Sequence, residues 1–239
     1  MEHYLNGETV TEEKIEATEK MVTSDVANEK NYDKALRIYS GMLVEDPGNP
    51  LLYRHRGHRY LSIERYEEAA ADISIATKLE PNYWKNWNYM GMINYYLGNY
   101  ERALTYYDKA LEVAGMNSLV SSAMINWEYL CLKHLGRDDD AMKVLKSFPA
   151  DLEKSLFAYK DLILMNRGLL TRSEVEKKYN DNDSNVYRST YEYGIAMSYY
   201  YEGNVAKAKE ILMDMRAKKK DIWFTLGYIA ADCELDRIK

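Results

Sequence analysis

The sequence is poor in the residues that would indicate a disulfide-stabilised or metal-binding protein. Its 239 residues include two cysteines, four histidines and four prolines. Cys131 and Cys233 lie far apart, and neither belongs to a C-x2-C or Cys/His ligand spacing. We therefore expect two reduced thiols and no metal or other cofactor. So few prolines also allow nearly all of the chain to be helical.

Long apolar runs are missing as well. No segment approaches the roughly 18 uninterrupted apolar residues of a membrane-spanning helix, and the first 30 residues contain no apolar core of a signal peptide. The sequence predicts no membrane partner and a cytoplasmic location. A chain whose export signal has been removed is an alternative that the sequence leaves open.

The charge balance argues against a nucleic-acid partner. The formal net charge is -6 and the pI is near 5.4, whereas affinity for nucleic acid depends on clustered lysines and arginines that face phosphates. Hydrophobic residues make up 46% and charged residues 29% of the chain, which is the balance of a globular protein.

The most informative pattern is an internal repeat, because residues 50–83 and 84–117 align over 34 positions without a gap. The second block has the spacing W-x2-L-G-x6-G-x-Y-x2-A-x3-Y-x2-A, carried by Trp87, Met90, Gly91, Gly98, Tyr100, Ala103, Tyr107 and Ala110. The matching columns of the first block hold Tyr53, Gly57, Tyr60, Tyr66, Ala69, Ile73, Ala76 and Pro81. This pattern resembles the tetratricopeptide repeat family.

The resemblance implies an all-α fold, a right-handed superhelical α-solenoid of antiparallel helix hairpins. We expect a tail over residues 1–10 and one continuous superhelix over residues 11–239. Its approximate repeats are 11–49, 50–83, 84–117, 118–150, 151–183 and 184–219, followed by a terminal helix over 221–239. Small residues such as Gly91 should lie where two helices cross closely, so a bulky side chain there should destabilise the protein.

The register of the 118–150 repeat is ambiguous. Counting back from Gly136 and Ala141 places Ile125 and Tyr129 on core columns and turns Trp127 toward the groove. Matching Trp127 to the first column of W-x2-L-G buries it instead, but requires a turn that is two residues shorter.

The resemblance also implies that the first helix of each hairpin lines a concave face. On the 100° step of a helix, columns 2, 5, 9, 12 and 13 point together, away from the core columns. We expect peptide contacts from the residues Arg54, His58, Lys85, Asn88 and Tyr96. The alternative is that Tyr95 and Tyr96 pack between repeats while Arg54 and Lys85 are merely solvated.

Members of the family that bind the C-terminal EEVD tails of chaperones use five polar or basic clamp positions. The corresponding residues here are Arg54, His58, Tyr89, Ala123 and Trp127 in one register, and four of the five differ in chemical type. The resemblance therefore predicts that this chain does not bind such tails.

A dense basic motif runs from Tyr53 to Tyr60, with three arginines and two histidines in eight residues. Arg56 falls on a normally apolar column, so it must reach solvent or find a carboxylate. His55 and His58 could share one face as metal ligands, but no third ligand is identifiable. The motif resembles one in uncharacterised bacterial tetratricopeptide proteins, over residues 32–80 and with no implied activity.

No nucleophile, zinc-hydrolase or phosphate-loop motif surrounds any of the four histidines, so we predict no enzymatic activity. The sequence favours a non-catalytic scaffold that binds a protein or peptide. Two alternatives are a peptide-sensing regulator and the repeat portion of a larger protein whose effector or catalytic domain lies elsewhere. The partner's identity and the oligomeric state stay open.

Overall fold

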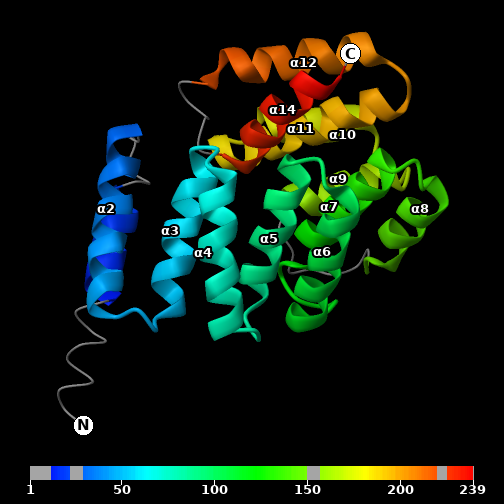
Figure 1. The fold of residues 1–239 in the computed structure, drawn as a ribbon. Coiled ribbons are helices and arrows are strands. Elements are labelled where there is room, and N and C mark those ends of the chain that lie inside the picture. The colour runs from blue at the N-terminus through cyan, green and yellow to red at the C-terminus, as the bar shows by residue number, and fades with distance from the viewer. Residues whose placement is uncertain (1–11, 22–28, 150–156, 220–224, 239) are drawn as a thin grey trace. The chain divides into compact units, whose positions relative to one another are not determined.

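A computed structural model describes residues 12–21, 29–149, 157–219 and 225–238. Every regular element in these ranges is a helix, and no strand occurs among them. The predicted fold class, an all-α solenoid of helix hairpins, is confirmed. The chain divides into two compact units, residues 1–81 (unit 1) and 82–239 (unit 2). Figure 1 shows the helices of both units. The predicted tail over residues 1–10 lies outside the described ranges.

Unit 1 contains a helical segment over residues 12–21, then α2 (Glu29–Glu45), α3 (Pro50–Ser62) and α4 (Tyr66–Leu79). The start of α3 follows from its first residues. The side chain of Asn49 accepts a hydrogen bond from the Leu51 amide at 3.1 Å, and Pro50 occupies the first turn, where its missing amide costs nothing. α3 packs on α2 on one side and on α4 on the other.

The α3–α4 and α5–α6 hairpins repeat the same close helix crossing. A Cβ atom built on Gly57 would lie 2.8 Å from Ile73 Cδ1, and one built on Gly91 would lie 2.6 Å from Tyr107 Cε1. Both contacts join the same pair of repeat columns, 34 residues apart in the chain. The small residues of the repeat are therefore required by the distance between its two helices.

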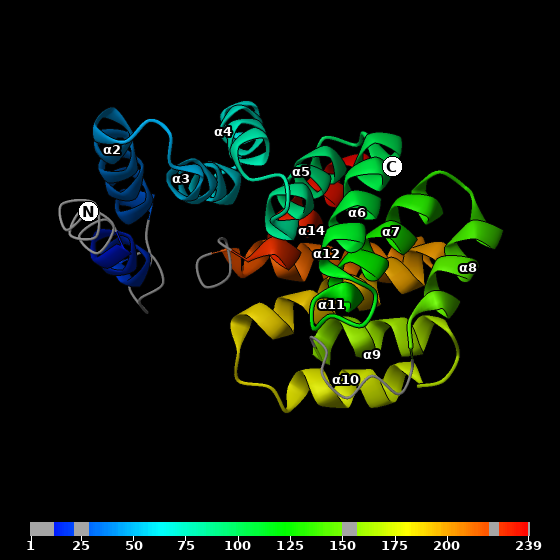
Figure 2. The ribbon, with the colours of Figure 1, turned by 90° about the horizontal axis from the view of Figure 1, so that it is seen from below.

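Unit 2 contains α5 (Trp84–Tyr96), α6 (Tyr100–Ala114), α7 (Ser121–His134), α8 (Asp138–Ser147), α9 (Phe157–Asn166), α10 (Arg172–Asn180), α11 (Asn185–Tyr201), α12 (Val205–Ala217) and α14 (Leu226–Arg237). Figure 2 shows α9, α10 and α11 side by side. Among the described residues, none of the helices combines the length and apolarity needed to cross a bilayer.

The turns inside the hairpins share one backbone conformation. Four of them place a glycine at positive φ: Gly98 at 77°, Gly136 at 69°, Gly168 at 74° and Gly203 at 86°. The α3–α4 turn places Glu64 there instead, at a φ of 61°. This left-handed conformation is strained for a residue with a Cβ atom.

The structure resolves the register of the 118–150 repeat. Gly136 closes the α7–α8 turn as Gly98 closes the α5–α6 turn, which places Ile125 and Tyr129 on the core columns. Trp127 is nevertheless buried, because its ring packs against Tyr95 at 4.9 Å and Tyr193 at 6.0 Å between centroids.

The terminal helix α14 packs against α11 and α12 and also contacts α5. A Cβ atom on Gly227 would lie only 2.4 Å from the Ser189 carbonyl oxygen, so α14 and α11 meet backbone to backbone. The Tyr96 hydroxyl donates a hydrogen bond to the Leu226 carbonyl at 3.1 Å. The predicted start of this helix at Asp221 lies outside the described residues.

Candidate functional site

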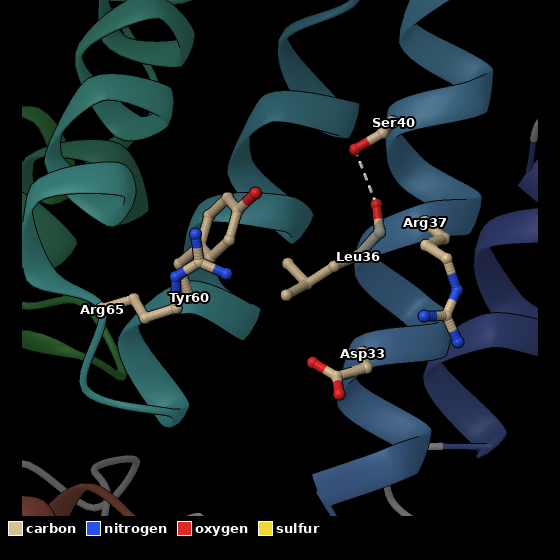
Figure 3. Close-up of a pocket in the computed structure, with 6 residues that line it drawn as sticks. All are labelled: Asp33, Leu36, Arg37, Ser40, Tyr60 and Arg65. Atoms are coloured by element: carbon tan, nitrogen blue, oxygen red, sulfur yellow. Dashed lines mark hydrogen bonds between the residues drawn. The ribbon is translucent and has the colours of Figure 1, made fainter.

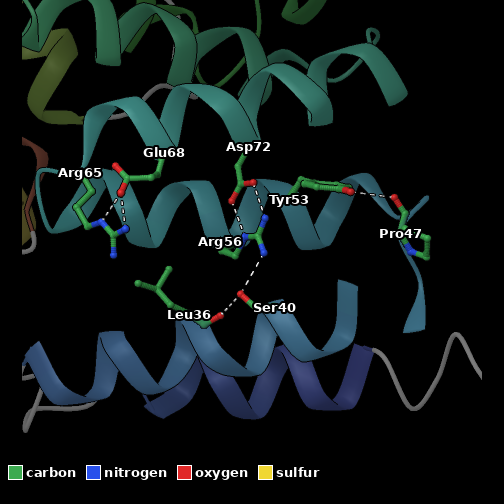
Figure 4. Close-up of polar contacts among 8 residues, drawn as sticks. All are labelled: Leu36, Ser40, Pro47, Tyr53, Arg56, Arg65, Glu68 and Asp72. Atoms are coloured by element: carbon green, nitrogen blue, oxygen red, sulfur yellow. Dashed lines mark hydrogen bonds and ion pairs between the residues drawn. The ribbon is translucent and has the colours of Figure 1, made fainter. Parts of the chain in front are cut away.

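The basic motif of α3 faces inward rather than toward solvent. Arg54 is 8% exposed and its Nη1 lies 2.5 Å from the Glu80 carboxylate. Arg56 donates from Nε and Nη2 to the two carboxylate oxygens of Asp72, each at 2.7 Å, and from Nη1 to Ser40 at 3.1 Å (Figure 4). The expectation that Arg56 needs a carboxylate partner is thus met inside its own hairpin.

Two other basic residues of this motif, His55 and Arg59, lie beside the carboxylate of Glu19. The Tyr39 hydroxyl donates to Glu19 at 2.6 Å, His55 Nδ1 lies 3.3 Å from it, and Arg59 Nη2 lies 3.6 Å from it. Burial by itself would raise the pKa of Glu19, but the hydrogen bond from His55, the charge of Arg59 and the Tyr39 hydroxyl hold it at about 2. The motif therefore ties the 12–21 helix to α2 and α3.

The two histidines of the motif have different surroundings. His55 Nδ1 faces Glu19, and the His58 ring contacts the guanidinium of Arg59. A guanidinium beside a ring nitrogen disfavours a metal cation, because like charges repel. The pair is better suited to a structural role in unit 1 than to metal binding.

A cavity of about 340 Å³ opens between α2 and α3 of unit 1 (Figure 3). Its lining residues are Asp33, Leu36, Arg37, Ser40, Tyr60 and Arg65. The side chains of Asp33 and Leu36 extend from α2 toward Tyr60 and Arg65. The guanidinium of Arg65 lies over the Tyr60 ring, 4.7 Å from its centroid, and its Nε donates to Glu68 at 2.8 Å. The cavity thus has an apolar side, a carboxylate and a neutralised cation.

The predicted contact residues of unit 1 lie on α3. Arg54 is buried against Glu80, and His58 is partly exposed. The repeat pattern does not indicate the cavity between α2 and α3, because α2 carries only a divergent version of the repeat. The one available signal was the row of polar residues Asp33, Arg37 and Ser40 at helical spacing on α2.

The predicted contact residues of unit 2 lie on α5. Lys85 and Asn88 are partly exposed, whereas Tyr96 is 2% exposed. The Asn88 side chain donates to the Met92 sulfur at 3.6 Å, and its Oδ1 accepts no hydrogen bond from the described residues. The binding role of all five predicted residues stays a prediction.

A network of aromatic and polar side chains covers the same face of α5. The hydroxyls of Tyr95 and Tyr193 lie 2.6 Å apart, and the Tyr95 hydroxyl lies 3.1 Å from His134 Nε2. The His134 ring stacks on Tyr100 at 4.3 Å, and its Nε2 lies 3.4 Å from the buried carboxylate of Glu234 on α14. Within unit 2, the chain's own helices thus occupy the face on which Tyr95 and Tyr96 lie.

Glu128 on α7 is a second buried acid of unit 2. It is 4% exposed, and its Oε1 accepts no hydrogen bond from the described residues. Burial, with a smaller contribution from the negative charge of Asp108, raises the pKa of the Glu128 carboxyl to about 8. Glu128 is therefore mostly protonated in the folded protein at neutral pH.

Comparison with known proteins gives a match to the tetratricopeptide repeat family model over residues 84–116. The chain is 33% identical over 86 residues to the heat-shock protein cognate co-chaperone sgt12 of Aspergillus fumigatus, covering 36% of this chain and 25% of that protein. It is 29% identical over 96 residues to heat shock protein STI1 of Saccharomyces cerevisiae, covering 40% and 16%. It is 31% identical over 94 residues to serine/threonine-protein phosphatase 5 of Mus musculus, covering 39% and 19%.

The matched segments make up a quarter or less of each of these relatives. Two solved structures are similar over most of the chain. MamA gives a TM-score of 0.48 at 13% identity, covering 87% of this chain and 92% of that one. YrrB gives 0.42 at 18% identity, covering 83% and 97%. Residues 84–116 thus match a tetratricopeptide repeat, and the 50–83 hairpin has the same helix crossing.

Proposed function

We propose that this protein is a non-catalytic scaffold that binds a protein or peptide. The observation that carries the proposal is the pair of hairpins α3–α4 and α5–α6, which share one register and one helix crossing. The second of them matches the repeat family. Stacked repeats of this kind present extended surfaces suited to binding other chains. The matched segments of two relatives belong to proteins named as a co-chaperone and a heat-shock protein, which supports a protein partner.

Within this proposal, the residues that contact the partner directly are the predicted ones that are partly exposed. These are His58 in unit 1, and Lys85 and Asn88 in unit 2. The Oδ1 of Asn88 is buried and accepts no hydrogen bond from a described residue, so a partner would reach only the rest of that side chain. Arg54 is buried in unit 1 and Tyr96 in unit 2, and each would contribute by holding its own helix in place.

Binding of a chaperone tail is a second candidate function, favoured by the names of these relatives. The side chains oppose it. At the clamp positions, Arg54 is already paired with Glu80, while Tyr89 and Trp127 are buried. A carboxylate of the tail would have to compete with Glu80 for the one remaining cation. We expect no EEVD binding, and calorimetry with an EEVD peptide tests this, since micromolar affinity would establish the second function.

Capture with the full chain from native lysate, followed by mass spectrometry, would identify partners for purification. Calorimetry should then show direct binding, and Asn88→Ala or Lys85→Ala should weaken it about fivefold, the effect of roughly 1 kcal/mol. Lys207→Ala is the matched control, because that lysine is also partly exposed but lies on α12, outside the predicted contact residues. If no purified candidate binds the chain directly, the scaffold function is wrong. If a partner binds both variants as tightly as wild type, the predicted contact residues are wrong.

A further inference from the structure

The net negative charge of this protein comes entirely from unit 1. Residues 1–81 hold 16 aspartates and glutamates against 10 lysines and arginines, so the whole formal charge of -6 falls in unit 1. Residues 82–239 hold 22 of each and are balanced. Three of the ten cations in unit 1 are Arg54, Arg56 and Arg59, whose guanidinium groups are directed to carboxylates inside the unit. Outside these three pairs, the described residues of unit 1 include ten acidic and seven basic ones, so the surface that they form is net acidic.

The cavity between α2 and α3 opens on this surface. The charged side chains on its two walls differ in how closely they are paired. Arg65, on the α4 side, makes its hydrogen bonds to Glu68 and lies flat on Tyr60. Asp33, on the α2 side, is exposed and makes no hydrogen bond or close ion pair with a described residue, and its negative charge acts on Arg65 only at longer range. In Figure 3, Asp33 and Leu36 extend toward Tyr60 and Arg65, whereas the guanidinium of Arg37 does not.

We propose that this cavity receives one lysine or arginine side chain of a protein partner. The aliphatic stem would lie against Leu36, and the charged end would pair with the carboxylate of Asp33. A cavity of about 340 Å³ exceeds the volume of such a side chain and leaves room for the apolar residues beside it. Arg37 and Arg65 both line the cavity, so a run of basic residues would be repelled more strongly than one basic side chain. The site therefore selects a single basic residue rather than a basic run.

The inference rests on the proposed protein-binding function and names the partner's chemistry. Three peptides test it, Ac-Ser-Leu-Lys-Leu-Ser-NH2 and its counterparts with Gln or Glu in place of Lys. Titration of the full chain, followed by backbone amide resonances, should show saturable shifts at residues 33–40 and 60–65 with the Lys peptide. The Gln peptide should bind about fivefold more weakly, and the Glu peptide more weakly still, because an exposed ion pair contributes up to about 1 kcal/mol.

Two variants separate a local ion pair from general attraction. Asp33→Asn should lower affinity for the Lys peptide to that of the Gln peptide. Glu45→Gln removes the same charge from an exposed position of the same helix and should leave affinity within about twofold of wild type, because charges separated by more than a Debye length are screened. Circular dichroism would confirm that both variants are folded.

The proposal is overturned if Asp33→Asn and Glu45→Gln weaken binding equally, since net charge alone would then explain the affinity. It is also overturned if the Lys peptide fails to shift these amides or if the Glu peptide binds as well. A purified partner that binds Asp33→Asn like wild type would refute this site and leave the scaffold function standing. The absence of any direct partner would refute the scaffold function itself.

Discussion

Two hydrogen bonds of 2.7 Å join the guanidinium of Arg56 to the carboxylate of Asp72 across the α3–α4 hairpin. The Asp72 side chain is 6% exposed, so this carboxylate depends on Arg56 for its charge compensation. In the next hairpin, the same two columns hold Met90 and Tyr106. The repeat therefore accepts an ion pair and an uncharged pair at equivalent positions.

Removing one partner of this ion pair should cost far more than replacing both. We expect Arg56→Ala to lower the free energy of unfolding by about 3 kcal/mol, because it leaves Asp72 buried and unpaired. The double variant Arg56→Met with Asp72→Leu should recover most of that loss, as the Met90 column indicates. Chemical denaturation followed by circular dichroism measures both, and a loss below about 1 kcal/mol in the single variant would show that Asp72 finds another partner.

The crossing of α5 and α6 at Gly91 should not tolerate a side chain. Gly91→Ala places a methyl group against the buried ring of Tyr107, and we expect a loss of about 1 to 3 kcal/mol, with a larger loss for Gly91→Leu. Gly41→Ala is the control, because nothing lies within 4 Å of a Cβ atom there. In the interior of α2 that change should stabilise by about 0.5 to 1 kcal/mol. Equal thermal melts for the two alanine variants would contradict the crossing.

Glu64 should be a poor residue for its turn. Its φ of 61° is the conformation that glycine supplies in four other hairpins, and a side chain there costs about 1 to 2 kcal/mol. Because glycine also loses more entropy on folding, we expect Glu64→Gly to stabilise by a net 0.5 to 1 kcal/mol, roughly. The reverse change, Gly98→Glu, should destabilise. If Glu64→Gly lowers the melting temperature instead, contacts of the Glu64 side chain outweigh the backbone strain.

Glu128 should make the stability of unit 2 depend on pH. Its folded pKa of about 8 exceeds the unfolded value near 4.3, so the folded state keeps a proton that the unfolded chain releases. The contribution of Glu128 to stability is therefore full below about pH 4 and is lost as the pH rises to 8. Glu128→Gln cannot ionise, and its advantage over wild type should grow from roughly 1 kcal/mol at pH 5 to roughly 4 to 5 kcal/mol at pH 8.

The matched control for Glu128 is Glu101→Gln, at an exposed position of the neighbouring helix α6. That variant should unfold much like wild type, because the carboxylate is exposed and its ion pair with Arg137, at 3.6 Å, lies at the surface, where such pairs contribute little. Denaturant titrations at pH 5 and pH 8 provide the comparison. A constant difference between Glu128→Gln and wild type across this interval would mean that Glu128 ionises normally in the folded protein.

The local features of the repeat could be predicted from the sequence because nearby residues determine them. The Asn49 cap, the Gly98 turn and the column of Gly57 and Gly91 each depend on one helix, one turn or one hairpin. The register of α7 is ambiguous in the sequence because few local residues determine it. It depends on a single glycine, Gly136, once the spacing between repeats is no longer 34 residues.

Contacts between distant segments could not be predicted. Glu19 contacts His55 and Arg59, which lie more than thirty residues further along the chain. Glu19 itself lies in a first repeat that is too divergent to align. Tyr96 was placed on an exposed face because helical geometry alone cannot show that α14, about 130 residues later, covers it. A column assigns a direction to a side chain, but burial depends on what packs in that direction.

The division of the chain after Pro81 has a spectroscopic consequence. All four tryptophans, Trp84, Trp87, Trp127 and Trp223, follow that boundary, so unit 1 contains none. Selectively excited indole emission therefore reports only on unit 2, while the helical dichroism signal reports on both. A melt recorded with both signals should separate the Arg56 and Glu64 variants, which alter the dichroism transition first, from the Gly91 and Glu128 variants, which also move the emission transition. The unmodified protein thus carries its own reporter for one half of the chain.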